Sequence, residues 1–375
     1  MDPPGLYVHI PFCKTKCPYC DFYSVTDLSA LDTWLEALNK EADMYRDVFG
    51  TFDSLYLGGG TPSLLDNRQM ETLIKTVRGC FAFTNDVEIS MEVNPDDVDV
   101  EKLKCWHDCG INRISIGVQS FDDDELVFLK RRHSATGANR SIEHVVSVGF
   151  ENFGIDLMFG LPSQTEDILI SNLEKALNFE PKHLSCYQLT LEKKTPYGRL
   201  KAEGRIKPLS ENKEKRLFAL TSAYLKSKGF IHYEISNFAK AVQYESRHNK
   251  KYWQHIQYLG LGPAAHSFND NKRWWNCKSV DRYCKDISKR IKPIDGFEIL
   301  SDEQLRLERL LLGFRTKFGV AIRDVKDNQS FEQTLLRLQR RRIVKAVSYT
   351  HLRAHETVLD IVCRLLLEKK NTNNT

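Results

Sequence analysis

Three cysteines fall within eight residues near the start of the chain, at Cys13, Cys17 and Cys20. The segment before them, Gly5–Ile10, is apolar and β-branched enough to be a buried strand, so the thiols lie on the loop that follows it. Thiolates are soft donors that bind iron–sulfur clusters or zinc. Zinc usually requires a fourth nearby cysteine or histidine, and His9 lies on the strand instead. The spacing therefore favours an iron–sulfur cluster, with a zinc knuckle as the alternative.

Three thiolates on a four-iron cube leave one iron without a protein ligand. That iron can chelate the amino and carboxylate groups of S-adenosylmethionine, and one electron from a low-potential cluster can then break a sulfur–carbon bond of the bound molecule. In parallel α/β proteins, sites are built on the loops that follow the carboxyl ends of strands. The three cysteines occupy a loop of this kind.

The composition indicates a globular protein of one large domain with a smaller appendage: 375 residues, 41% hydrophobic and 28% charged. The net charge of +4 comes without a long basic block, so we expect no nucleic-acid partner. No apolar run approaches the ~20 residues of a membrane span, and no signal peptide is recognisable at the start. Ten cysteines are too few for a secreted disulfide scaffold of this length. We therefore expect a cytoplasmic protein with no transmembrane segment.

Strand-like and helix-like segments alternate six times through the first 230 residues. The expected strands are Gly5–Ile10, Ser54–Leu57, Val87–Val93, Arg113–Val118, Gly154–Phe159 and His183–Leu189. The expected helices are Leu28–Val48, Asn67–Arg78, Val100–Cys109, Thr136–Val148, Glu166–Asn178 and Ser210–Ser227. Such alternation predicts parallel strands with right-handed crossovers. Because a complete eightfold barrel is usually longer, we predict an α/β fold with an open, partial (β/α)6 TIM-like barrel. A flat, doubly wound sheet is the alternative.

The rest of the chain divides into three further segments. Residues 231–295 are rich in aromatic residues and histidine, and residues 296–346 begin with a strongly helical pattern that indicates a small, partial helical domain. Residues 347–375 form a tail of different character. The core domain is then 1–230.

The spacing Cys-x3-Cys-x2-Cys, with the aromatic Tyr19 before the last cysteine, resembles the radical S-adenosylmethionine superfamily. The flanking segment Tyr7–Phe12 looks like its oxygen-independent coproporphyrinogen III oxidase branch, whose members include haem chaperones. The resemblance runs from about Gly5 to about Lys345. It implies a [4Fe-4S] cluster on the three cysteines, bound S-adenosylmethionine and a small winged-helix-like C-terminal domain, which here is truncated.

The same resemblance assigns a set of S-adenosylmethionine contacts. A glycine-rich turn, Gly58–Pro62, follows the second strand and matches the family segment that contacts the methionine amino group. Polar residues near the ends of later strands complete the set, because such side chains converge on one mouth of a barrel. The implied contacts are Tyr7, Tyr19, Gly59, Gly60, Thr61, Glu92, Gln119, Arg131 and Asp156. Among them Glu92 and Asp156 would accept ribose or amino hydrogen bonds, and Arg131 would pair with the carboxylate.

Other features separate a haem chaperone from an oxidase. The oxidases carry a further cysteine two residues beyond the third ligand, where this chain has Phe22, and a longer segment before the first strand. The segment 248–253 resembles the His-Asn-x-x-Tyr-Trp motif of the chaperones and implies haem contacts from His248, Asn249, Tyr252 and Trp253. Haem iron accepts histidine as an axial ligand, and Lys250 and Lys251 are near for its propionates.

From Val347 onwards the sequence departs from the family pattern and looks like translated sequencing-adapter read-through. For this reason we assign no function to His351, His355 or Cys363.

The leading prediction is a haem chaperone that binds a [4Fe-4S] cluster, S-adenosylmethionine and haem, and transfers haem to an acceptor protein. An electron donor would be needed if the cluster is reduced, and no residue is assigned a catalytic role. The first alternative is an oxygen-independent coproporphyrinogen III oxidase, which would decarboxylate its substrate by radical chemistry. The second is a non-catalytic metal-binding scaffold.

Overall fold

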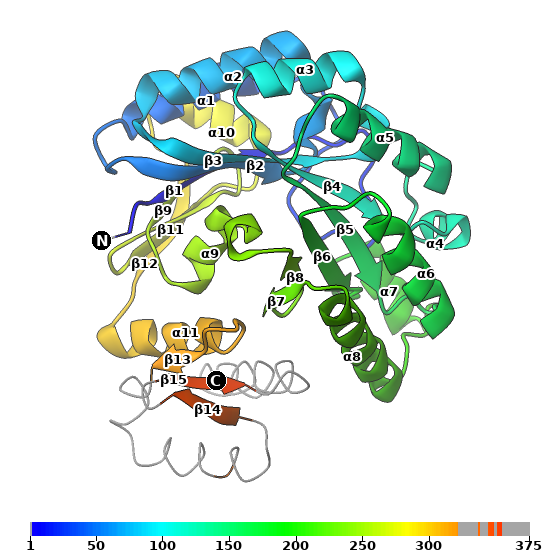
Figure 1. Cartoon of the computed structure of the whole chain (residues 1–375). Helices are drawn as coiled ribbons and strands as arrows, with labels where there is room; N and C mark the ends of the chain where they lie inside the picture. Colours follow the sequence, from blue (N-terminus) through cyan, green and yellow to red (C-terminus); the bar gives the residue numbers. More distant parts are fainter. Residues whose placement is uncertain (1, 322–336, 338–343, 349–350, 355–375) are drawn as a thin grey trace.

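One curved sheet of twelve strands, covered on its outer face by helices, forms most of the protein (Figure 1). The structure is a computed structural model and describes residues 2–321, 337, 344–348 and 351–354. The strands follow the order β12-β11-β10-β9-β1-β2-β3-β4-β5-β6-β8-β7. Six consecutive parallel strands form its centre: β1 (Gly5–Ile10), β2 (Phe52–Gly59), β3 (Phe83–Val93), β4 (Arg113–Gln119), β5 (Phe153–Phe159) and β6 (His183–Gln188).

Helices connect these strands and cover the outer face of the sheet. The long ones are α1 (Leu31–Met44), α2 (Asn67–Cys80), α3 (Val100–Asp108), α5 (Ala135–Ser147), α6 (Glu166–Leu177) and α8 (Glu211–Ser227). Two short helices, α4 (Asp123–Phe128) and α7 (Pro196–Ala202), lie in the loops after β4 and β6. Most begin at a side-chain cap, such as Asp66 of α2, whose carboxylate accepts from the Gln69 amide at 2.8 Å.

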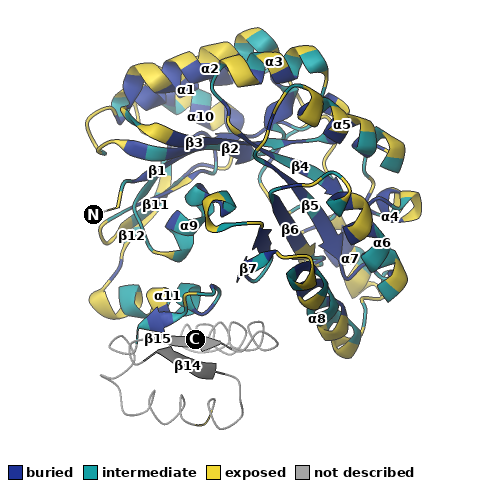
Figure 2. Cartoon of the chain, viewed as in Figure 1, coloured by how far each residue is buried: buried dark blue, intermediate teal, exposed yellow. Residues whose placement is uncertain are grey.

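Successive side chains of each strand point alternately toward the helices and toward the hollow of the sheet. Leu6, Val8 and Ile10 of β1 are fully buried on the helical side, in one apolar core with helix residues such as Trp34 and Leu38. Figure 2 shows this core as a continuous buried layer between the sheet and the exposed outer helix faces. The alternate positions are polar or aromatic. Because side chains alternate between faces with a period of two, strands β2 to β6 send polar side chains into the hollow.

The prediction of an open (β/α)6 barrel is confirmed. Each of the six predicted strands and six predicted helices is present, with ends that differ by a few residues. The sheet ends at β7 (Ile231–Glu234) on one edge and β12 (Ile294–Ile299) on the other, and the described strands do not close it.

Residues 231–299 extend this sheet, which the periodicity of the sequence did not predict. They form β7, β8 (Asn237–Ala239), α9 (Arg247–Trp253), β9 (Tyr258–Leu261), β10 (His266–Asn269), β11 (Lys272–Asn276), α10 (Val280–Ser288) and β12. Strand β9 pairs with β1 in parallel, and β10, β11 and β12 follow as antiparallel neighbours. Helix α9 lies in the hollow of the sheet, against β1 and β2 (Figure 1).

The C-terminal segment begins with α11 (Asp302–Gly313). A second small sheet follows, with the order β13 (Val320–Ala321), β15 (His351–Ala354) and β14 (Val344–Ser348). Most of the predicted tail, including His355 and Cys363, lies outside the described residues, so the read-through interpretation stays a prediction. Among the helices described here, none is long and apolar enough to cross a membrane.

A buried carboxylate ties the first helix to the sheet extension. Glu41 of α1 is fully buried and accepts hydrogen bonds from the Gly262 amide, the Asn276 side-chain amide and the Tyr283 hydroxyl, each at 2.7 Å. Burial raises the pKa of Glu41 to about 7. Its three donors come from the loop after β9, from β11 and from α10, so this side chain adds to the β9–β1 pairing in holding the added strands against the barrel.

We expect Glu41→Ala to lower the free energy of unfolding by about 3 kcal/mol or more, because it leaves three buried donors without an acceptor. Urea unfolding followed by circular dichroism measures the change. Glu36→Ala, an exposed site on the same helix, is the matched control. Equal effects of the two substitutions would show that the Glu41 network does not stabilise the fold.

Candidate functional site

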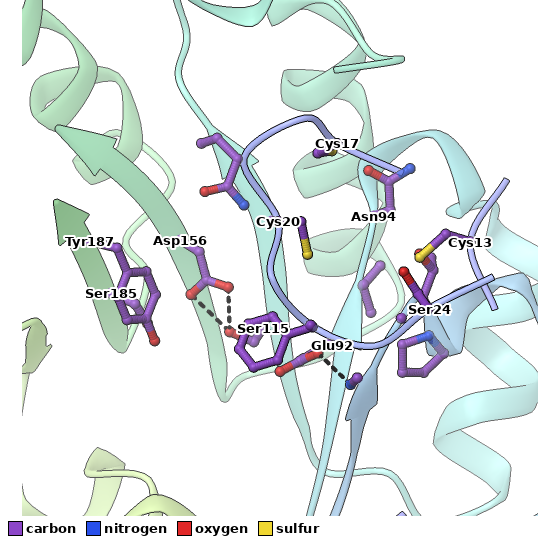
Figure 3. A pocket seen from close by; sticks show the side chains of 18 of the residues that line it. Cys13, Cys17, Cys20, Ser24, Glu92, Asn94, Ser115, Asp156, Ser185 and Tyr187 are labelled. Atoms are coloured by element: carbon purple, nitrogen blue, oxygen red, sulfur yellow. Dashed lines mark hydrogen bonds between the residues drawn. The ribbon is translucent and has the colours of Figure 1, made fainter. Parts of the chain in front are cut away.

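A pocket of about 440 Å³ opens at the carboxyl ends of the parallel strands and runs down into the hollow of the sheet. Its upper wall is the loop that carries the three cysteines, and its sides are the inward-facing residues of β2 to β6. Figure 3 shows Cys13, Cys17 and Cys20 around one side and Glu92, Asp156 and Tyr187 across from them. Eight of the nine predicted S-adenosylmethionine contacts line this pocket: Tyr19, Gly59, Gly60, Thr61, Glu92, Gln119, Arg131 and Asp156.

The cysteine loop is closed at its base by backbone pairing. Val25 donates to the Pro11 carbonyl at 2.8 Å, and Cys13 donates to the Val25 carbonyl at 3.0 Å. All three thiols are free and partly exposed to the pocket. Burial raises the pKa of the Cys20 thiol, and the nearby Cys17 and Cys13 raise it further. The loop therefore gathers three unpaired thiols at one rim.

The glycine-rich turn after β2 lies directly against the start of this loop. The Gly60 amide donates to the Ile10 carbonyl at 2.7 Å, and a Cβ at Gly60 would lie 2.6 Å from the Phe12 carbonyl. Gly59 has a φ of +107°, a conformation that L side chains rarely adopt. Only glycines allow this approach, which also places the Thr61 hydroxyl 3.3 Å from the Cys13 sulfur.

Two carboxylates face the pocket from neighbouring parts of the sheet. Glu92 of β3 accepts from the Tyr56 hydroxyl at 2.8 Å and from the Gly59 amide at 3.2 Å. Asp156 of β5 accepts from the Ser115 hydroxyl at 3.0 Å (Figure 3). Burial raises the pKa of Glu92 to about 7, and the charge of Asp156 adds to this shift. Burial also raises the pKa of Asp156. Glu92 is therefore able to hold or accept a proton near neutral pH.

Arg131 supplies a positive charge next to the cysteines. It lies just after the turn that ends α4. Its guanidinium donates to Asn94 Oδ1 at 2.6 Å and to the Gly117 carbonyl at 2.7 Å, and lies 3.5 Å from the Cys17 sulfur. Gln119 ends β4 with a φ of +70°, a strained backbone conformation of the kind found at binding sites.

Tyr7 is the predicted contact that the pocket does not include. Its hydroxyl hydrogen-bonds His9 Nδ1 at 3.1 Å, and its ring lies beside that of Tyr56, with centroids 6.1 Å apart. Tyr56, which does line the pocket, thus separates Tyr7 from the predicted ligand site. The assignment of Tyr7 stays a prediction.

The structure adds an acidic residue that sequence analysis missed. Asp97, whose side chain is fully buried, accepts from Lys14 of the cysteine loop at 2.8 Å and from Arg132 at 2.9 Å. Asn94 and Asp97 lie within four residues of the end of β3. A run of polar residues directly after a strand was the feature of the sequence that could have identified Asp97. Asp97 therefore anchors the loop to the turn that carries Arg131.

The predicted haem residues occupy the floor of the pocket and the space behind it. Asn249 lines the pocket, whereas His248 is fully buried below it, with Nδ1 3.2 Å from Ser54 Oγ and Nε2 2.9 Å from the Tyr252 hydroxyl. Burial lowers the pKa of His248 to about 3, so its ring is neutral. Trp253 packs edge-on against Tyr233, with ring centroids 5.8 Å apart.

The two lysines of this motif already have partners. Lys251 is buried and lies 2.8 Å from Asp53, and Lys250 lies 3.2 Å from Glu245. Neither reaches the pocket as a free cation, and the haem assignments of the motif stay predictions.

The residues present fit a cluster with a polar ligand beside it. Arg131 Nε, Ser24 Oγ and Ser90 Oγ are buried and have no hydrogen-bond partner in the described part of the chain, and all three residues line the pocket. Buried polar atoms without partners are costly unless a ligand satisfies them. Within the described ranges, no three histidine, cysteine or carboxylate side chains lie close enough to hold a single metal ion. The ligands of a cluster bind separate irons, so they need not meet at one point.

Residues 7–176 match the Radical SAM superfamily, the class that the open barrel and the three-cysteine pocket define. Curated relatives extend the match over most of the chain. "Heme chaperone HemW" of Bacillus subtilis is 37% identical over 322 residues, covering 84% of this chain and 84% of that protein. The proteins of the same name from Mycobacterium tuberculosis and Escherichia coli are 34% and 36% identical, over 85% and 71% of this chain and 83% and 70% of their own lengths. The chain belongs to the HemW family.

A solved structure shares the fold. Coproporphyrinogen III oxidase (HemN) from Escherichia coli, a radical SAM enzyme, superposes with a TM-score of 0.82 at 22% identity, over 97% of this chain and 90% of that one. This similarity confirms the architecture of barrel and extension.

We expect Asp97→Ala to loosen the cysteine loop, because Lys14 and Arg132 lose their shared buried acceptor. Amide hydrogen exchange of residues 12–25 should become faster by roughly tenfold, which corresponds to about 1.4 kcal/mol. Asp96→Ala, at the neighbouring half-exposed site 3.9 Å from Arg132, is the control. Unchanged exchange in the Asp97 variant would show that the loop is held by its backbone bonds alone.

Proposed function

We propose that this protein is a haem chaperone that carries a [4Fe-4S] cluster on Cys13, Cys17 and Cys20, binds S-adenosylmethionine next to it, and transfers haem to an acceptor protein. The observation that carries the proposal is that the three free thiols share one pocket with Gly60, Glu92, Arg131 and Asp156 in a chain of the HemW family. The curated relatives are named as haem chaperones, which supports haem as the cargo.

The residues of the pocket suit the parts of S-adenosylmethionine. Arg131 offers a buried cation for a carboxylate, and its unpartnered Nε can donate to a ligand. Glu92 and Asp156 offer acceptors for amino or ribose groups, and Ser24 and Ser90 add hydroxyls. A pocket of 440 Å³ is of the size that one ligand of this class requires. When bound and reduced, the cluster would supply one electron to the sulfonium. An electron-donor protein is then a further partner.

Each residue of this set has a role that the contacts support. Thr61 donates to the Cys13 sulfur and fixes its orientation, and Arg131 places a positive charge beside Cys17. The cytoplasmic location expected from the sequence is part of the proposal, because thiols and clusters of this kind persist in reducing compartments.

We expect binding of S-adenosylmethionine to strengthen as the pH rises from 6 to 8. With a pKa of about 7, Glu92 is about one-tenth ionised at pH 6 and about nine-tenths at pH 8, and the ionised carboxylate accepts hydrogen bonds from the ligand more strongly than the neutral acid does. The expected gain is up to about tenfold in affinity, measured by anaerobic equilibrium dialysis of cluster-loaded protein. Glu92→Gln should weaken binding and remove this pH dependence. The same pH dependence in the variant would assign it to another group.

Two assays, haem titration and porphyrinogen turnover, distinguish the proposed haem chaperone from the alternative functions. We expect added haemin to give a shifted Soret band with the purified protein, and coproporphyrinogen III with S-adenosylmethionine and dithionite to remain undecarboxylated. Absence of haem binding would refute the chaperone. Turnover of the porphyrinogen would instead establish the oxidase, and a colourless, iron-free protein after anaerobic reconstitution would establish the scaffold.

A further inference from the structure

Tyr56 of β2 links the short helix α9 to the three-cysteine pocket. On one side its ring is stacked on the imidazole of His248, with centroids 5.2 Å apart and an angle of 27° between the planes. On the other side its hydroxyl donates to the Glu92 carboxylate at 2.8 Å. Tyr56 and Glu92 line the pocket, whereas His248 is fully buried below it. One side chain therefore touches both the predicted haem motif and a predicted S-adenosylmethionine contact.

The contact between Tyr56 and Glu92 is tight. Both side chains lie over Gly58, where a Cβ would be 2.8 Å from the Tyr56 ring and 3.1 Å from the Glu92 carboxylate. The second carboxylate oxygen of Glu92 accepts from the Gly59 amide at 3.2 Å. Two donors from β2 thus set the direction in which this carboxylate points. Because closely packed groups transmit displacements to one another, a movement of the Tyr56 ring changes the position of Glu92.

The His248 end of this link has no free ring nitrogen to offer a ligand. Nδ1 lies 3.2 Å from Ser54 Oγ and Nε2 lies 2.9 Å from the Tyr252 hydroxyl, so both nitrogens already have partners. A histidine needs a free nitrogen lone pair to bind haem iron. Haem ligation by His248 therefore breaks one of these hydrogen bonds and moves the ring from its place on Tyr56.

A second connection joins α9 to the strand that carries Glu92. The His248 amide donates to Glu88 of β3 at 3.1 Å, and Glu88 lies four residues before Glu92, on the same face of that strand. The helix also reaches the pocket directly, through Asn249. Helix α9 is thus connected to β3 both through Glu88 and through Tyr56, and both connections depend on the position of His248.

We propose that Tyr56 couples the two ligand sites, so that haem bound through α9 weakens the binding of S-adenosylmethionine and S-adenosylmethionine weakens the binding of haem. Loss of the stack on His248 releases the Tyr56 ring, and Glu92 then loses the donor that orients it in the pocket. The two effects have the same size, because coupling between two binding sites is reciprocal. Tyr56 acts through Glu92 and is a positioning residue.

This inference rests on the proposed haem-chaperone function and adds a release step to it. A chaperone must give up its cargo as well as bind it. With this coupling, a pocket loaded with S-adenosylmethionine lowers the affinity for haem and favours its transfer to the acceptor protein.

Two anaerobic titrations of the cluster-loaded full chain measure the coupling. Equilibrium dialysis gives the Kd of S-adenosylmethionine with and without saturating haemin, and the Soret band gives the Kd of haemin with and without saturating S-adenosylmethionine. We expect each ligand to weaken the other by about fivefold or more, and by the same factor. Tyr56→Phe keeps the ring but removes the hydrogen bond to Glu92, so both factors should fall to about one in this variant.

Tyr224→Phe is the matched control, because it removes a bond of the same kind outside the pocket. The Tyr224 hydroxyl of α8 donates to Glu174 of α6 at 3.2 Å, in the layer of helices that covers the sheet. This variant should keep the coupling of the wild type.

Amide hydrogen exchange gives a readout that does not require S-adenosylmethionine to bind. In the wild type without this ligand, haemin should speed the exchange of the Gly59 amide, whose acceptor is Glu92. In Tyr56→Phe, haemin should leave that rate unchanged. The exchange rate therefore decides the question even if the variant no longer binds S-adenosylmethionine.

The outcomes separate this inference from the proposed function. If the wild type binds haem and haemin leaves either the affinity for S-adenosylmethionine or the exchange of Gly59 unchanged, the inference is overturned and the chaperone function stands. Equal coupling in the wild type and in Tyr56→Phe would also overturn it, since the two ligands would then compete directly in the pocket. A wild type that shows no Soret shift with haemin would overturn both.

Discussion

The close approach of two backbone segments, Ile10–Phe12 and Gly58–Thr61, determines where everything else in the site lies. The amide of Gly60 and the carbonyl of Ile10 meet at 2.7 Å, and no side chain fits between the segments. This contact fixes the direction in which the chain leaves β1, and therefore where the three thiols lie. It also brings Thr61 to the Cys13 sulfur and the Gly59 amide to Glu92. A single substitution at Gly60 would separate the cysteine loop from the remainder of the pocket.

The parallel barrel could be predicted from the sequence because its two signals agree. Apolar residues alternate along the strands, and an amphipathic helix follows each one, in most cases from a side-chain cap such as Asp66 of α2. The location of the pocket could also be predicted, since the carboxyl ends of parallel strands meet at one rim of the barrel. Glu92 and Gln119 lie at or next to the ends of their strands, and Asp156 lies within β5 and lines the same pocket.

The sheet extension could not be predicted in this way. Strands β7 to β11 are short and rich in aromatic residues, and they pair mostly with antiparallel neighbours, so neither helical nor strand periodicity extends far enough to be recognised. The partners that orient the site were equally hidden: Ser115 beneath Asp156, Tyr56 beneath Glu92 and Asp97 beneath Lys14. These pairs depend on tertiary contacts between segments that are distant in the sequence. Burial of His248 has the same origin, because only the fold shows that α9 turns into the hollow.

The account depends on an open iron next to Arg131 and Glu92, and electron–nuclear double resonance of the reduced, reconstituted protein tests it most directly. With S-adenosylmethionine labelled with 15N at the amino group and 17O at the carboxylate, the account predicts hyperfine coupling of both labels to the cluster. A reduced four-iron cluster that shows coupling to neither label would contradict it.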